Sequence, residues 1–117
     1  MARKKMDKPV VTIFEELLPL VKSNLIIDYD RDDALLTRII RSAVDCAERY
    51  QNIERETYRA LCDMPPTARQ AVIMLASHWY ESRDGSTGGF FGDRTQAADA
   101  VMTAVNRLLT LDRRVAL

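Results

Sequence analysis

All four glycines of this 117-residue chain fall between positions 85 and 92, in the stretch DGSTGGFFGD that begins at Asp84. A glycine in a helix interior costs about 1 kcal/mol relative to alanine, so helical segments avoid it. The rest of the chain has no glycine, and its hydrophobic residues recur at intervals of three and four. We therefore predict an all-α fold, a small bundle of about four helices with a long Gly-rich loop before the last helix.

The length and the charge distribution predict the domain organisation. A chain of 117 residues, 47% of them hydrophobic, suffices for one modest core. Its formal net charge is +0, but residues 1–8 carry four cations against the single acid Asp7, and this local excess leaves the remainder slightly acidic. We expect residues 1–9 to form a flexible basic tail and residues 10–117 to form a single helical domain.

The basic start of the chain looks at first like a secretory signal. The apolar run that follows it ends at Glu15, however, whereas a signal needs roughly 7–15 apolar residues and a membrane span about 18. We expect no membrane partner, and a chain that acts in the cytosol or in a particle assembled there. The basic tail itself is expected to be solvated, with contact to nucleic acid or to an acidic protein surface as the alternative.

Residues 10–24 allow two local structures. Thr12 and Glu15 have the spacing of a capping box, and hydrophobic residues follow at helical intervals. Pro19 lacks an amide donor, however, and inside such a helix it would clash with the carbonyl of Glu15. In the alternative, residues 10–14 are extended and a short helix follows with Pro19 in its first turn. We favour the second structure because proline is tolerated at a first turn.

Residues 28–50 carry the strongest helical pattern. Asp30 is the expected N-cap, with Asp32 and Asp33 in the first turn, where the helix dipole favours negative charge. The hydrophobic face consists of Leu36, Ile39, Ile40, Ala43, Val44, Ala47 and Tyr50. The expected flanks are Arg38, Arg41, Asp45, Glu48 and Arg49, with i,i+4 ion pairs between 41 and 45 and between 45 and 49.

Two more helices follow a connector at residues 53–64 that has no sustained period. The first is predicted at residues 66–83, with Pro66 at or near its first position. Its hydrophobic face consists of Ala68, Ala71, Val72, Leu75, Ala76 and Trp79. The last helix is predicted to begin near Asp93 or Thr95 and to end near position 112.

No set of residues indicates catalysis, a cofactor or a metal. His78 is the single histidine and lacks a nucleophile motif, and the thiols of Cys46 and Cys62 have no ligand spacing. Acids at alternate positions from Asp28 resemble the start of an EF-hand, but the sixth position is Asp33 instead of glycine. The connector is also too long for the 3–4-residue turn of a helix-turn-helix. We expect no catalytic, cofactor-binding or metal site.

The order of these elements resembles the head–tail connector (adaptor) proteins of long-tailed phages, over about residues 22–109. The matching pieces are DDALL at 32–36, ERY at 48–50, the prolines at 65–66, WYESR at 79–83, and NRLL at 106–109 followed by Arg113 and Arg114. The sequence departs from that pattern at 95–97, where TQA stands in place of a helix-opening proline.

The resemblance implies a structural role without catalysis. It implies a subunit of a homo-oligomeric ring, twelvefold in the virion, beneath the portal protein. The ring would extend the DNA channel, let DNA pass without sequence-specific binding, and dock the next neck (stopper) or tail-completion protein. Its place would be the virion neck, after assembly in the host cytoplasm. The alternative is a small helical regulatory module that binds protein or nucleic acid as a monomer or dimer.

Two groups of residues are candidates for these contacts. The expected partner or assembly interface consists of Phe90, Phe91, Arg113, Arg114 and Val115, because segments that order on binding adapt to a partner and exposed hydrophobic residues mark contacts. For the Phe90–Phe91 pair, a hairpin tucked against the core is the alternative. Trp79, Tyr80, Glu81 and Arg83 are expected to form a structural cluster that supports the core, with subunit contact as the alternative role.

Overall fold

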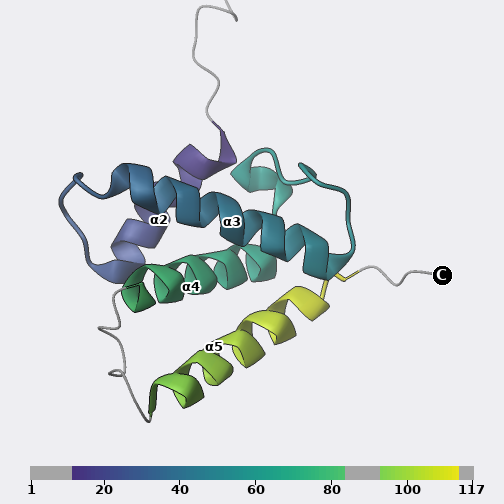
Figure 1. Ribbon diagram of the computed structural model, residues 1–117. Helices are drawn as coiled ribbons and strands as arrows, with labels where there is room; N and C mark the ends of the chain where they lie inside the picture. The colour runs from purple at the N-terminus through teal and green to yellow at the C-terminus, as the bar shows by residue number, and fades with distance from the viewer. Residues whose placement is uncertain (1–11, 84–92, 114–117) are drawn as a thin grey trace, which may run out of the picture.

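The computed structural model describes residues 12–83 and 93–113, with side chains of the last helix described from residue 99 onward. Within these ranges the chain forms four α-helices and one 3₁₀ turn, and no β-strand (Figure 1). The elements are α2 (Ile13–Leu25), α3 (Asp33–Gln51), η1 (Leu61–Asp63), α4 (Pro66–Ser82) and α5 (Asp93–Thr110). The predicted all-α bundle is confirmed, while the Gly-rich stretch before α5 lies outside the described residues.

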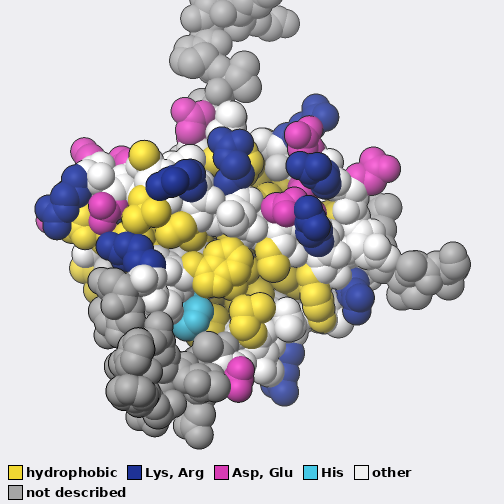
Figure 2. All heavy atoms as spheres, viewed as in Figure 1, with side chains coloured by type: hydrophobic (Ala, Val, Ile, Leu, Met, Phe, Trp, Pro, Cys, Tyr) yellow, Lys and Arg dark blue, Asp and Glu magenta, His cyan; other side chains and the backbone are white. Residues whose placement is uncertain are grey.

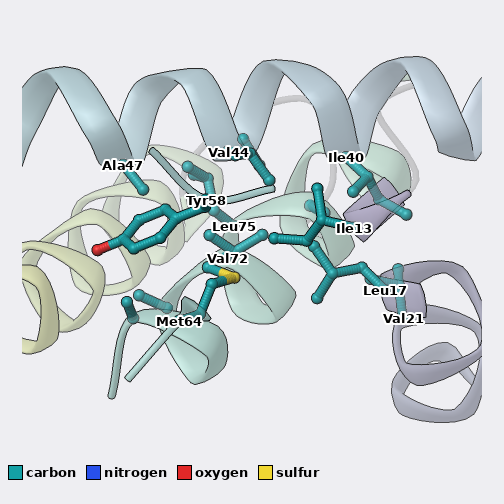
Figure 3. Packing of buried hydrophobic residues seen from close by; sticks show 14 of the residues in the cluster. Ile13, Leu17, Val21, Ile40, Val44, Ala47, Tyr58, Met64, Val72 and Leu75 are labelled. Carbon is teal, nitrogen blue, oxygen red and sulfur yellow. The ribbon is translucent and has the colours of Figure 1, made fainter. Parts of the chain in front are cut away.

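Helix α4 lies at the centre of the bundle. It packs against α2, α3 and α5, and its small residues Ala68, Ala71 and Ala76 are fully buried, which lets the neighbouring helices approach closely. Side chains from α2, α3, α4 and the connector meet in one core (Figure 3). The labelled members are Ile13, Leu17, Val21, Ile40, Val44, Ala47, Tyr58, Met64, Val72 and Leu75.

Helix α2 overturns the favoured prediction for residues 10–24. The helix begins at Ile13 with a complete capping box: the Thr12 amide donates to Glu15 Oε1 at 2.9 Å, and the Glu15 amide donates to Thr12 Oγ1 at 3.3 Å. Pro19 lies inside the helix and is exposed. Full burial of Ile13, Leu17 and Val21 contributes roughly 1.5–3 kcal/mol each, which exceeds the ~3 kcal/mol cost of one interior proline.

Helix α3 begins later than predicted. Its N-cap is Asp32 instead of Asp30, and the Leu36 amide donates to the Asp32 carbonyl at 2.8 Å. The Asp30 carbonyl accepts from the Asp33 amide at 3.1 Å, in a turn that precedes the helix. The Asp32 carboxylate makes no capping bond, because it is engaged by Tyr80.

The hydrophobic face of α3 is confirmed, but its flank is not entirely solvent-exposed. Glu48 is only 3% exposed, because the connector folds back over the last turns of α3. Its carboxylate accepts the amide of Glu56 at 3.0 Å and that of Tyr58 at 2.9 Å. The adjacent Gln51 is also fully buried and donates to the Leu109 carbonyl at 3.1 Å, which ties α3 to α5.

Of the two predicted ion pairs on α3, the second is present. Arg49 Nε lies 2.9 Å from Asp45 Oδ2, and Arg55 of the connector lies 3.9 Å from the other oxygen of Asp45. Arg41 instead stacks on the ring of Phe14, with its guanidinium carbon 4.4 Å from the ring centre. The N-terminal half of α2 therefore competes with Asp45 for the Arg41 side chain.

Helices α4 and α5 agree closely with the predicted spans. Pro66 occupies the first position of α4, and α5 begins at Asp93. The described side chains of α5 are fully buried at Val105 and Leu109, in its second half, whereas Val101 and Met102 nearer its start are only half-buried.

Candidate assembly surfaces

The cluster at the end of α4 centres on Tyr80, whose side chain is buried. Its hydroxyl donates to the Asp32 carboxylate and lies 3.3 Å from the hydroxyl of Tyr29. The hydrogen bond to Asp32 raises the pKa of Tyr80 well above its ordinary value, with smaller contributions from Tyr29 and from burial. The phenol therefore stays neutral and acts as a donor to the N-cap residue of α3.

Arg83 completes this cluster directly after α4. Its guanidinium carbon lies 4.0 Å from the ring centre of Tyr80, and it donates to the Tyr80 carbonyl at the end of the helix. Its Nη2 atom also lies 3.8 Å from the carboxylate of Asp32. One arginine thus contacts the aromatic face, the helix end and the acid that begins α3.

Two further contacts fasten the same end of the bundle. Lys22 Nζ of α2 lies 2.7 Å from Asp30 and 2.8 Å from Asp33, and both carboxylates raise its pKa. Asn24 of α2 donates to the hydroxyl of Ser77 on α4 at 2.8 Å. The segment between α2 and α3 is therefore attached to α2, α3 and α4 by polar contacts.

Of the four residues assigned to the structural cluster, the structure shows Tyr80 and Arg83 in contact. Trp79 is half-buried against the hydrophobic core, Tyr80 is buried, and Arg83 covers its ring. Glu81 is exposed on α4. The cluster ties helices together within one subunit, and its alternative role in subunit contact stays a prediction.

The expected assembly residues are described only in part. Phe90, Phe91, Arg114 and Val115 lie outside the described residues. Arg113 is exposed, and its guanidinium carbon lies 4.9 Å from the ring centre of Tyr50 on α3. The hydroxyl of that tyrosine lies 3.0 Å from Thr110 Oγ1, so the chain after α5 remains close to the end of α3.

Sequence reasoning missed two strongly exposed hydrophobic residues. Ile26, the C-cap of α2, is 91% exposed and has φ 60° and ψ 48°, and Leu111, directly after α5, is 68% exposed. The signal for the first was present: α2 ends without the glycine or asparagine that usually occupies a left-handed C-terminal position. Neither side chain contributes to the core.

A cleft of about 560 Å³ lies between the start of α2, the middle of α3 and the connector. Its rim holds the cations Arg41, Arg55 and Arg59 and the acids Asp45 and Glu56. The face shown in Figure 2 also carries a band of hydrophobic side chains between α3 and α5.

No arrangement of the described side chains indicates metal binding or nucleophilic chemistry. In the described ranges, no three His, Cys, Asp or Glu residues gather closely enough to hold a metal ion. Burial raises the pKa of the Cys46 thiol, with a further contribution from Asp45, which disfavours a reactive thiolate. His78 is half-buried on α4.

Comparisons with known proteins identify the family of the chain. In the part of the chain that the structure describes, no helix has the length and hydrophobicity of a membrane span. No curated protein and no solved structure matches the chain significantly. The family model described as phage gp6-like head–tail connector protein matches residues 16–113, which include α3, α4, α5 and most of α2. A match over most of the chain shows the family, and the chain belongs to the gp6-like head–tail connector proteins of phages.

Proposed function

We propose that this connector protein forms a homo-oligomeric ring, twelvefold in the virion, beneath the portal of the phage head. The observation that carries the proposal is the family match over residues 16–113. Membership in that family makes the chain a structural component between head and tail, in the neck of the virion. In the proposed arrangement the ring extends the DNA channel and docks the next neck (stopper) or tail-completion protein.

The charge of the helical part supports passage of DNA without sequence-specific binding. The chain has equal numbers of cations and acids, 17 each, and its first eight residues hold a local excess of cations. Each phosphate that a protein neutralises with a cation adds affinity for DNA, so a slightly acidic channel subunit holds DNA only weakly. Such a subunit lets DNA slide during packaging and ejection.

Docking to the portal and to the next neck protein is assigned to two segments. These are the Gly-rich stretch with Phe90 and Phe91, and the chain after α5 with Arg113, Arg114 and Val115. Arg113 is exposed beside Tyr50, where it is available to an acidic partner surface. Assembly of these contacts takes place in the host cytoplasm, where the filled head receives its neck.

The experiment that tests the function mixes the purified chain with a portal ring from the same phage. Co-sedimentation and negative-stain images should show a second ring stacked on the portal. Replacing Phe90 and Phe91 together with serine should leave the far-UV circular dichroism unchanged and weaken this stacking. A Leu20→Ser variant, which alters an exposed hydrophobic residue of α2, serves as the control.

Two results would contradict the proposal. One is failure of the chain to bind the portal ring or to assemble on it at any protein concentration. The other is a monomer or dimer that ignores the portal and binds DNA with strong salt dependence, which would favour the regulatory module.

A further inference from the structure

Ile26 is an unusual residue for the position that it occupies. The end of α2 is capped by backbone hydrogen bonds, with the Ile27 amide donating to the Lys22 carbonyl at 2.9 Å, but this cap places a β-branched residue at its left-handed position. The residue closes α2 in the left-handed region, where its amide contacts the Lys22 and Ser23 carbonyls. This region disfavours β-branched residues and favours glycine or asparagine. The side chain is also 91% exposed, so burial does not compensate for the unfavourable backbone. Unfavourable backbone conformations cluster at functional sites, so Ile26 is a candidate for contact with a partner.

Leu111 is the second large hydrophobic residue that the described chain leaves mostly in water, at 68% exposure. It follows α5 directly, in a turn where its amide donates to the Leu108 carbonyl at 3.3 Å. That turn is fixed to the rest of the bundle, because the Thr67 hydroxyl donates to the Asp112 carboxylate at 2.9 Å. Leu111 is therefore presented on an ordered surface.

The two residues belong to opposite ends of the bundle. In Figure 1 the end of α2 lies on one side, with the start of α3 and the end of α4. The end of α5 lies on the other side, with the end of α3 and the start of α4. Identical subunits in a ring need two different surfaces that complement each other across a heterologous contact. Opposite ends supply such a pair.

The charges at the two ends are complementary. The surface around Ile26 has the exposed acids Asp28 and Asp30. Lys22 pairs with Asp30, but the same ammonium also pairs with Asp33 and so is shared between two carboxylates. Arg31 at this end stacks on Tyr29, 4.1 Å from the ring centre. The surface around Leu111 has the exposed cations Arg107 and Arg113 and the acid Asp112, which accepts a hydrogen bond from Thr67.

We infer that neighbouring subunits meet head to tail, with the surface of Ile26, Asp28 and Asp30 on one copy against the surface of Leu111, Arg107 and Arg113 on the next. The partner is a second copy of this chain, and the inference rests on the proposed ring. A two-fold dimer through either surface alone would place like charges opposite each other, which is unfavourable. The head-to-tail contact buries both hydrophobic residues and pairs the charges.

Two single variants test the contact. Ile26→Asn keeps a residue that tolerates the left-handed conformation, and Leu111→Ser changes only an exposed side chain, so both variants should remain folded. Each should raise the protein concentration needed for assembly, in solution or on the portal ring, by about tenfold or more. Leu20→Ser, at 37% exposure, is the matched control and should assemble as the wild type does.

A mixing experiment distinguishes this contact from other arrangements. An equimolar mixture of Ile26→Asn and Leu111→Ser retains one intact contact, between Leu111 of the first variant and Ile26 of the second. The mixture should give heterodimers and no rings, as measured by sedimentation at concentrations where the wild type is assembled. Absence of heterodimers, or normal rings from either variant alone, would overturn the inference while wild-type rings leave the proposed function intact. Absence of any wild-type assembly, in solution and on the portal, would instead refute both.

Discussion

Glu48 offers the sharpest test of how this fold is held together. Its buried carboxylate accepts two backbone amides, those of Glu56 and Tyr58, at 3.0 and 2.9 Å. Glu48→Ala leaves both amides without this acceptor. A buried donor left unsatisfied, as at Tyr58, costs about 1–3 kcal/mol, and the part-buried amide of Glu56 adds to that loss. We expect a loss of about 3 kcal/mol in the free energy of unfolding, and a fall in Tm of more than about 10 °C for a domain of this size.

Urea denaturation followed by far-UV circular dichroism and by Trp79 fluorescence measures this loss. Glu48→Gln retains one acceptor oxygen and should lie between the wild type and the alanine variant. Glu54→Gln, an exposed acid of the same connector, is the control and should change stability by less than about 0.5 kcal/mol. A Glu48→Ala variant as stable as this control would refute the assigned role of the carboxylate.

Three further predictions concern single side chains. Ile26→Asn should stabilise the monomer by about 0.5–1 kcal/mol in urea denaturation, since asparagine tolerates the left-handed region; a destabilised variant would contradict this. Tyr80→Phe should cost about 1–2 kcal/mol near pH 7. Because the folded-state pKa of Tyr80 is raised above the ordinary value of 10.0, its contribution is full below pH 10 and is lost at higher pH. The gap between wild type and Tyr80→Phe should therefore narrow above pH 10, and a constant gap would argue against that shift. Exposed Cys62 should react with a thiol reagent faster than Cys46, whose pKa burial raises, so Cys62→Ser should remove the fast phase.

The sequence predicted the helices that carry their own hydrophobic period. The faces of α3 and α4 repeat at three- and four-residue intervals, and Pro66 marks a helix start, so their spans were predictable from local pattern alone. The start of α2 was not, because the cost of Pro19 is local and visible, whereas the burial of Leu17 that outweighs it depends on tertiary packing.

For the candidate sites, too, contacts within one helix were predictable from the sequence, whereas contacts between distant segments were not. That Tyr80 and Arg83 act together could be read from their spacing at the end of one helix. Their partner Asp32 lies 48 residues before Tyr80 and carries no sign of that pairing, since an acid at a helix start is explained by capping alone. Glu48 was predicted on the flank of α3. Its burial was not predictable, because the amides that bind its carboxylate come from a connector without periodicity.

The distribution of buried side chains along α5 has a consequence for local opening. Among its described side chains, the fully buried Val105 and Leu109 occupy the second half, and the Leu109 carbonyl accepts from Gln51 of α3. Regions with few buried contacts exchange their amide hydrogens through small, frequent openings. Deuterium should therefore enter the amides around Val101 and Met102 before those around Val105 and Leu109, so that exchange within this part of α5 proceeds as a gradient toward its end.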